Sequence, residues 1–266
     1  MSYPRYLLTF LPPKLRIILF YRLFFGRAGS RTKLFKNAPL SLSPKIKMDL
    51  CHTDSSHQQI AYTGIFELHL SKIFIELANE GGLFVDVGAN YGYYSLLWAG
   101  ARSSNKALAF EAVKENAEVL SHNVTINNFE NRIHVENKAL GQSRGKMNFD
   151  SMDSKQTTWG GLTDSADSGF EVTVERLDEL VEKDSFIDVL KIDVEGADTW
   201  VLYGAQRLLE TKCIRNIFFE ENTARQQQLG IKPNDAEAFL KNLGYSVENL
   251  NQNTSGVSEF HARPKD

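Results

Sequence analysis

An alternation of short apolar runs and helical patterns begins near residue 63 and limits the folds open to this chain. The run Leu83–Val87 is apolar on both faces, as strands of a helix-covered parallel sheet usually are. A turn with two glycines, residues 88–92, follows it, and a helical pattern covers Tyr93–Ala101. Because strand–helix–strand crossovers are right-handed, this order predicts a doubly wound α/β sheet.

The same alternation predicts the other elements of the body. We expect further strands at residues 107–111, 133–136, 187–193, 214–220, 245–250 and 256–262. We expect further helices at residues 65–79, 114–127, 197–210 and 234–243. The last two strands are close enough in sequence to pair antiparallel.

The alternation stops between residues 141 and 174. Two expected strands, 146–150 and 170–174, flank a stretch rich in Ser, Thr, Asp and Gly at residues 151–169. A loop of this length inside a compact domain is usually functional or disordered. Its tryptophan, Trp159, is therefore expected either to form a lid or wall for a substrate or to anchor the loop to the body.

Composition excludes several classes of protein. The chain has 266 residues, of which 42% are hydrophobic and 24% charged, and this rules out disordered and collagen-like chains. Two cysteines are too few for a disulfide framework, and no apolar run approaches the roughly 20 residues that span a bilayer. We therefore expect a cytoplasmic protein in a reducing compartment.

The charge is distributed unevenly along the chain. Residues 1–48 contain ten Lys or Arg and no acidic residue, whereas residues 49–266 carry 20 basic against 33 acidic residues, a net charge of −13. Eight of the 29 aromatic residues also lie in residues 1–48. We interpret residues 1–48 as a basic arm and residues 60–266 as the catalytic domain. The arm suits an anionic membrane surface, or it packs as a helix on the body or on a second copy of the chain.

The turn after the first strand is the strongest chemical signal. Gly88 and Gly92 let the backbone approach a ligand, and the following helix N-terminus favours a carboxylate or phosphate. Asp86 ends the strand, where it can accept a hydrogen bond from an ammonium group or a water molecule. Glu111 ends the next strand, 23 residues after Gly88, where an acid can hold a ribose diol. The dinucleotide fingerprint G-x-G-x-x-G is absent, which disfavours a nicotinamide cofactor.

Acidic and amide side chains also follow two later strands. They are Asp193, Glu195, Glu220, Glu221 and Asn222. Ligands of open α/β sheets bind beyond the carboxyl ends of the strands, so we expect these side chains to converge on one rim. Asp193 is the first candidate for a general base or for orienting an acceptor, with Glu195 and Glu220 beside it. The alternatives are that Asp193 and Glu195 only cap the next helix, or that Asp193 and Glu220 or Glu221 bridge a divalent metal.

Three residues near position 51 resemble metal ligands at first sight. Cys51, His52 and His57 fit no standard zinc spacing. We expect a surface or packing role for them.

Several segments together resemble the FkbM-type S-adenosylmethionine-dependent methyltransferases. They are residues 86–96, Phe110-Glu111, the helix containing Leu120, Asn123 and Asn127, residues 172–180, the run Leu190–Asp198 with its Asp-Val-Glu-Gly, and residues 201–205. The resemblance covers roughly residues 60–250. It implies the class I methyltransferase fold, a Rossmann-like and mostly parallel seven-stranded sheet with an antiparallel last strand. It also implies methylation of an acceptor that is usually a hydroxyl.

The resemblance also implies roles for individual residues. Asp86, Gly88, Asn90 and Gly92 would hold the amino-acid end of S-adenosylmethionine, and Glu111 its ribose. The adenine would lie near residues 137–140. Ala112 stands where the family generally has proline, which loosens that turn but leaves the carboxylate in place.

The sequence therefore favours an S-adenosylmethionine-dependent O-methyltransferase acting on a small molecule, sugar or glycolipid. A nucleic-acid methyltransferase is disfavoured because residues 49–266, with a net charge of −13, would repel phosphates. A non-catalytic, membrane-peripheral protein that keeps the fold is the third alternative. Homo-oligomers through the apolar arm remain open.

Overall fold

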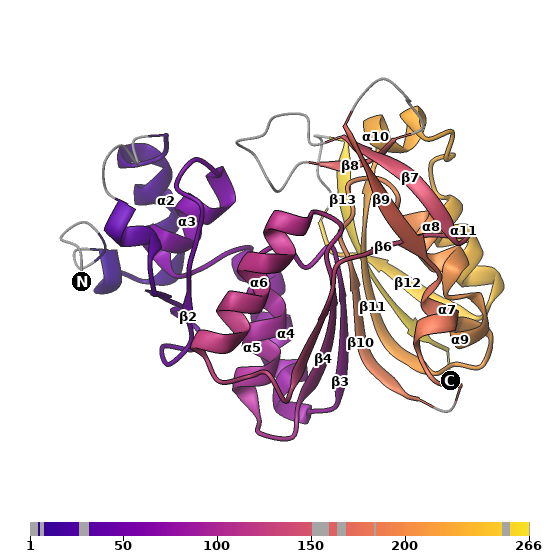
Figure 1. Cartoon of the computed structure of the whole chain (residues 1–266), viewed down its shortest axis with the longest axis horizontal. Helices are drawn as coiled ribbons and strands as arrows, with labels where there is room; N and C mark the ends of the chain where they lie inside the picture. The colour runs from indigo at the N-terminus through magenta and orange to yellow at the C-terminus, as the bar shows by residue number, and fades with distance from the viewer. Residues whose placement is uncertain are drawn as a thin grey trace.

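The computed structural model describes residues 5, 8–26, 32–150, 160–163, 169–183, 185–251 and 256–265. Trp159 and the interpretations placed on it lie outside these residues. Within them, a seven-stranded sheet forms the centre of the molecule (Figure 1). Its spatial order is β12 (Tyr245–Asn249), β13 (Val257–Pro264), β11 (Ile214–Asn222), β10 (Ile187–Ile192), β3 (Leu83–Val87), β4 (Lys106–Phe110) and β5 (Ile133–Glu136).

The strand directions match the predicted sheet. Strands β11, β10, β3, β4 and β5 run parallel to their neighbours in that order. The last strand, β13, pairs antiparallel with both β11 and β12. The mostly parallel seven-stranded sheet with an antiparallel last strand is thus confirmed.

Helices cover both faces of this sheet (Figure 1). One group consists of α4 (Leu68–Glu80), α5 (Tyr93–Ala101) and α6 (Lys114–Ile126). The other consists of α7 (Leu177–Leu180), α8 (Asp198–Gly204), α9 (Gln206–Glu210) and α11 (Asp235–Asn242). A short helix, α10 (Thr223–Gln228), follows β11 directly. The two groups of helices bury two separate hydrophobic clusters against the sheet.

Two predicted helices differ from the structure by more than one residue at an end or are divided. The helix expected at residues 197–210 is divided into α8 and α9 at Ala205. Gly204 lies just before the break, where a Cβ would come within 2.1 Å of the Gly141 carbonyl oxygen, so only glycine fits. Glycine also has a low helix propensity, which favours a break at this point. The helix expected from residue 65 begins only at Leu68, because Glu67 adopts a left-handed backbone with φ 39°.

A second, four-stranded sheet occupies the segment where the alternation stops. Its order is β6 (Ala139–Leu140), β9 (Phe170–Glu175), β7 (Gly145–Asp150) and β8 (Gly161–Thr163). The expectation of an uninterrupted loop over residues 151–169 was therefore wrong at β8, which pairs antiparallel with β7. Gly161 permits this path, because a Cβ there would lie 3.0 Å from the Glu195 carbonyl oxygen.

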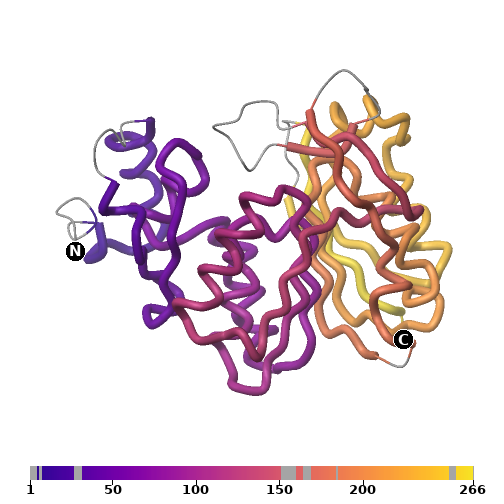
Figure 2. The backbone as a smooth tube through the Cα atoms, viewed as in Figure 1, coloured from indigo at the N-terminus to yellow at the C-terminus, as the bar shows by residue number. Residues whose placement is uncertain are grey.

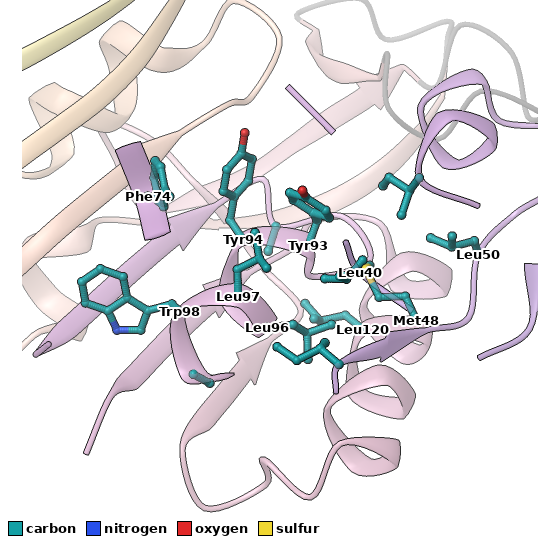
Figure 3. Close-up of a cluster of buried hydrophobic side chains, with 14 of the residues drawn as sticks. Leu40, Met48, Leu50, Phe74, Tyr93, Tyr94, Leu96, Leu97, Trp98 and Leu120 are labelled. Carbon is teal, nitrogen blue, oxygen red and sulfur yellow. The ribbon is translucent and has the colours of Figure 1, made fainter. Parts of the chain in front are cut away.

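The N-terminal segment folds onto the body rather than standing apart from it. It contains α2 (Pro13–Leu23), the 3₁₀ helix η1 (Thr32–Phe35), the strand pair β1 (Ala38–Pro39) and β2 (Lys47–Met48), and α3 (Ser55–Thr63). Figure 3 shows Leu40, Met48 and Leu50 beside side chains of α5 and α6 in one hydrophobic cluster. In the described part of the chain, no helix is both long and apolar enough to cross a membrane.

Candidate active site

A cavity of about 570 Å³ opens at the carboxyl ends of β3, β4, β10 and β11. Seven of the eight residues predicted for the site line it, namely Asp86, Gly88, Asn90, Glu111, Asp193, Glu195 and Glu220. Gly92 does not line it, and instead ends the turn at the N-terminus of α5. Residues of the expected adenine segment, Lys138, Ala139 and Leu140, form part of the wall.

The turn after β3 is fixed by close backbone contacts. The N–H groups of Gly88 and Ala89 donate to the Phe110 carbonyl at 2.9 and 3.0 Å. Gly88 has φ 80°, and a Cβ there would meet the Asp193 carbonyl oxygen at 2.0 Å. Both the conformation and the available space therefore require glycine at this position.

Glu111 joins the ends of β3 and β4. Its carboxylate accepts hydrogen bonds from the backbone N–H of Asn90 at 2.7 Å and of Val113 at 2.9 Å. The Asn116 amide lies 3.5 Å from it. Burial raises the pKa of Glu111 to about 7, although these donors oppose the rise. A carboxylate has about four lone-pair positions, so Glu111 can hold the turn and still accept from a ligand hydroxyl.

Asp86 is buried beneath the turn. It accepts a hydrogen bond from the Ser95 hydroxyl of α5 at 2.6 Å. Burial raises its pKa, and the nearby Lys191 ammonium opposes the change. Asp86 therefore ties β3 to α5 at the floor of the cavity.

His57 is a site residue that the sequence analysis missed. It comes from α3, is buried, and lines the cavity. Its Nδ1 lies 3.3 Å from the Cys51 backbone N–H, and its Nε2 lies 2.8 Å from the Asn90 amide oxygen. Because Nδ1 accepts a hydrogen bond from that N–H, the proton of the neutral ring is on Nε2. Nε2–H then donates a hydrogen bond to the Asn90 amide oxygen. His57 is buried and packs against Tyr91, which agrees with the expected packing role, but the sequence did not indicate that α3 places it in the wall of the cavity.

Lys191 is the buried cation at the centre of the acidic rim. Its Nζ donates to Asp193 at 2.7 Å and lies 5.0 Å above the centre of the Tyr94 ring. Burial alone would lower the pKa of Lys191, but Asp193, Glu67 and Asp86 raise it above its ordinary value. The lysine therefore stays charged and balances several carboxylates at once.

Glu67 is a second missed residue. Its left-handed backbone at the start of α4 turns the side chain into the cavity, where it accepts from the Tyr94 hydroxyl at 2.6 Å. Burial raises the pKa of Glu67 to about 7. No local pattern in the sequence indicated this conformation, because non-glycine residues seldom adopt it.

Glu195 and Glu220, two of the predicted catalytic residues, have raised pKa values. Burial and then the neighbouring Asp193 raise the pKa of Glu195 to about 7. The same two causes, in the same order, raise the pKa of Glu220 to about 10. Glu195, which has φ 52°, is held by the Asn222 amide at 3.3 Å. A pKa this high keeps Glu220 protonated at neutral pH, whereas the pKa of Glu195 lies close to neutral pH.

The capping interpretation of Asp193 and Glu195 was wrong. The N-cap of α8 is Ala197, with no side-chain hydrogen bond to the first turn. Asp193 is committed to Lys191, and Glu195 to Asn222.

The expectation that all acids at the end of β11 share one rim was wrong for Glu221. Successive side chains of a strand point to opposite faces, so Glu220 and Asn222 line the cavity and Glu221 is turned away. Among the described residues, no group of three or more His, Cys, Asp or Glu side chains is placed to hold a metal ion.

Comparison with known proteins identifies one family. The model of the methyltransferase FkbM domain matches residues 86–247. No match to the chain was found among curated proteins.

Solved structures with similar folds include two O-methyltransferases. One is the Bacillus cereus O-methyltransferase in complex with SAH, with 15% identity, a TM-score of 0.43, and coverage of 76% of this chain and 83% of that chain. The other is an S-adenosylmethionine-dependent O-methyltransferase from Thermotoga maritima, with 14% identity and a TM-score of 0.47. The match covers 76% of this chain and 66% of that chain. The likeness is distant, and the substrates of those proteins do not carry over to this chain.

Proposed function

Because this chain belongs to the FkbM family of S-adenosylmethionine-dependent methyltransferases, we propose that it methylates a hydroxyl group of a small molecule, sugar or glycolipid. The observation that carries this proposal is the shared cavity. It brings the turn after β3 and the acid at the end of β4 together with the carboxylates at the ends of β10 and β11.

The residues at the β3 and β4 end fit the cofactor that the family implies. Gly88 lets the turn lie against the Asp193 carbonyl, where a Cβ would clash, so the glycine fixes the turn at this edge of the cavity. Glu111 lies at the edge of the same space with acceptor capacity left for hydroxyl groups. Ala139, Leu140 and Leu162 give an apolar wall that suits a flat aromatic base.

Residue roles follow from this placement. Glu111 would hold the ribose hydroxyls, and the turn with Asp86, Gly88 and Asn90 would hold the amino-acid end. Gly92 would act indirectly by shaping the turn, because its φ is 88° and a Cβ there would meet Leu120 at 2.1 Å. When bound, S-adenosylmethionine supplies the methyl group.

Glu195 is the residue best suited to take the proton from the acceptor hydroxyl. A general base works best when its pKa is near the working pH, and the pKa of Glu195 is raised to about 7. Asp193, the first candidate from the sequence, forms an ion pair with Lys191 and is better suited to orienting the acceptor. Glu220, protonated at neutral pH, can donate a hydrogen bond to an acceptor oxygen.

Alignment of the acceptor hydroxyl would supply the rest of the rate acceleration. Methyl transfer to oxygen is an in-line displacement, so the acceptor oxygen must be held at a fixed distance and angle. Carboxylates and the Asn222 amide around one cavity provide several hydrogen-bonding groups for a polyhydroxylated acceptor. This polar rim supports a sugar or glycolipid hydroxyl over an apolar acceptor.

The test is methyl transfer from radiolabelled S-adenosylmethionine to a panel of hydroxylated glycans and glycolipids. We expect a labelled, alkali-stable methyl ether, and we expect Glu195→Gln to reduce turnover by roughly 10²–10⁴-fold. Glu248→Gln is the matched control, because Glu248 is exposed on β12. Label on RNA or on an amine, or full activity of Glu195→Gln, would contradict the proposal.

A further inference from the structure

The outer face of α2 is apolar and basic. Six of the eight large hydrophobic side chains that are exposed among the described residues lie between residues 10 and 25. Within α2 and its following turn, Leu15, Ile18, Tyr21 and Phe25 are between 42% and 59% exposed. Lys14 and Arg22 are also exposed, and each is four residues from Ile18, which places both on the same side of the helix. We call these six residues the outer face.

The inner face of α2 holds the helix on the body. Phe20 is buried, and its ring centre lies 5.5 Å from that of Tyr62 in α3. Arg16 donates to the carbonyls of Thr63, Thr9 and Leu11 at 2.8, 2.9 and 3.1 Å. The Arg16 guanidinium therefore binds at the C-terminal end of α3, where the carbonyl groups carry partial negative charge. The helix is thus fixed in place with Leu15, Ile18 and Phe25 turned outward.

Charge identifies what the outer face fits. Residues 8–26 and 32–48 contain no acidic residue, while residues 49–266 carry a net charge of −13. A symmetric contact with a second copy of α2 would bring Lys14 and Arg22 against their own counterparts, which is unfavourable. An anionic lipid surface offers phosphates to the cations and an apolar layer to the side chains between them.

We propose that the outer face of α2 docks this protein on anionic lipid bilayers. The acidic body orients the molecule, because it is repelled by the surface that attracts α2. Figure 2 shows the N-terminal segment at one end of the molecule, away from the C-terminal half, so α2 can reach a flat surface. Helix α3 has α2 on one side and contributes His57 and Ile60 to the cavity, which places the cavity one helix away from the docked face. This inference does not depend on which acceptor is methylated.

The experiment is co-sedimentation of the full chain with vesicles of phosphatidylcholine containing about one third phosphatidylglycerol, compared with pure phosphatidylcholine. We expect binding to the anionic vesicles that weakens with salt. Replacing Leu15, Ile18 and Phe25 together by serine should reduce the partition coefficient roughly tenfold or more. Lys14→Gln with Arg22→Gln should reduce it by about 25-fold, since each cation near the surface contributes about fivefold.

Matched variants control for folding and for non-specific binding to vesicles. Phe186→Ser removes an exposed aromatic from the body, and Lys72→Gln with Lys232→Gln removes two exposed cations there. All variants should keep the wild-type melting temperature, and the control variants should bind vesicles as the wild type does. Equal loss in the controls, no binding by the wild type, or a dimer in solution that Ile18→Ser dissociates would overturn the proposal.

Discussion

The two ends of the cavity are built in different ways. At the β3 and β4 end, backbone geometry dominates, since Gly88 touches the Asp193 carbonyl and Glu111 binds two backbone N–H groups. At the β10 and β11 end, charge dominates, because Lys191 balances Asp193 and Glu67 there, as well as Asp86 at the end of β3. A site made by backbone contacts tolerates few residue types, whereas a site made by charges responds to pH and to the loss of one partner.

The largest effect is expected for Lys191→Met, which leaves the surrounding carboxylates without their cation. Lys191 is buried but its partner Asp193 is 33% exposed, so we expect a cost at the lower end of the about 3–5 kcal/mol that is typical of a buried ion pair. The pKa values of Asp86 and Glu67, already raised by burial, would rise further, so the folded protein would bind protons that the unfolded chain has lost. The loss of stability should therefore be greater at about pH 8 than at about pH 5, as measured by urea unfolding. A loss independent of pH would show that Lys191 acts by packing alone.

Gly88→Ala should have the next largest effect. The added Cβ meets backbone rather than a movable side chain, so we expect a loss of at least about 3 kcal/mol in unfolding free energy. Gly230→Ala is the control, because Gly230 also has positive φ but no atom within 4 Å of its added Cβ. That variant should lose only about 1 kcal/mol. Similar losses of unfolding free energy in both variants would show that the close contact between Gly88 and the Asp193 carbonyl is not the cause.

Glu111 gives the cofactor end its own pH dependence. Its pKa is raised to about 7, so below that pH the free protein must release a proton before the carboxylate can accept ribose hydroxyls. Affinity for S-adenosylmethionine should fall by up to about tenfold for each pH unit below 7. Glu111→Gln should bind more weakly at about pH 8 but without this slope, as fluorescence titration would show. A wild-type affinity that is flat from about pH 5 to 8 would contradict the assignment.

The smallest effect is expected for His57→Ala. Losing the hydrogen bond from Nε2 to Asn90 should weaken cofactor affinity by about 1 kcal/mol, or roughly fivefold, without changing turnover at saturation. His52→Ala is the matched control, because His52 is exposed five residues earlier. Unchanged affinity of His57→Ala would show that α3 does not support the turn.

The sequence predicted the site residues at strand ends better than those that reach the cavity from other elements. Gly88, Asn90 and Glu111 belong to contiguous runs at strand ends, where the strand and the turn determine their position. Glu67 and His57 come from other elements, and their approach to the cavity depends on a left-handed residue and on the packing of α3.

One error and one alternative that the sequence left open have simple physical reasons. Alternation along β11 separates Glu221 from Glu220 and Asn222, and this parity could have been applied to the sequence once the strand was recognised. Helix α2 has apolar residues on both its buried and its exposed side, so it shows no single apolar stripe. Its two faces could be distinguished only after Phe20 and Arg16 were seen to be buried.

The most direct test of the division between the two ends is calorimetric titration with S-adenosylmethionine. We predict micromolar binding by the wild type, a loss of about 1–3 kcal/mol in Glu111→Ala, and near wild-type affinity in Glu195→Gln. The Glu195→Gln protein should nevertheless fail to transfer the methyl group. The opposite pattern, with affinity lost in Glu195→Gln and kept in Glu111→Ala, would contradict the account, as would no binding by the folded wild type.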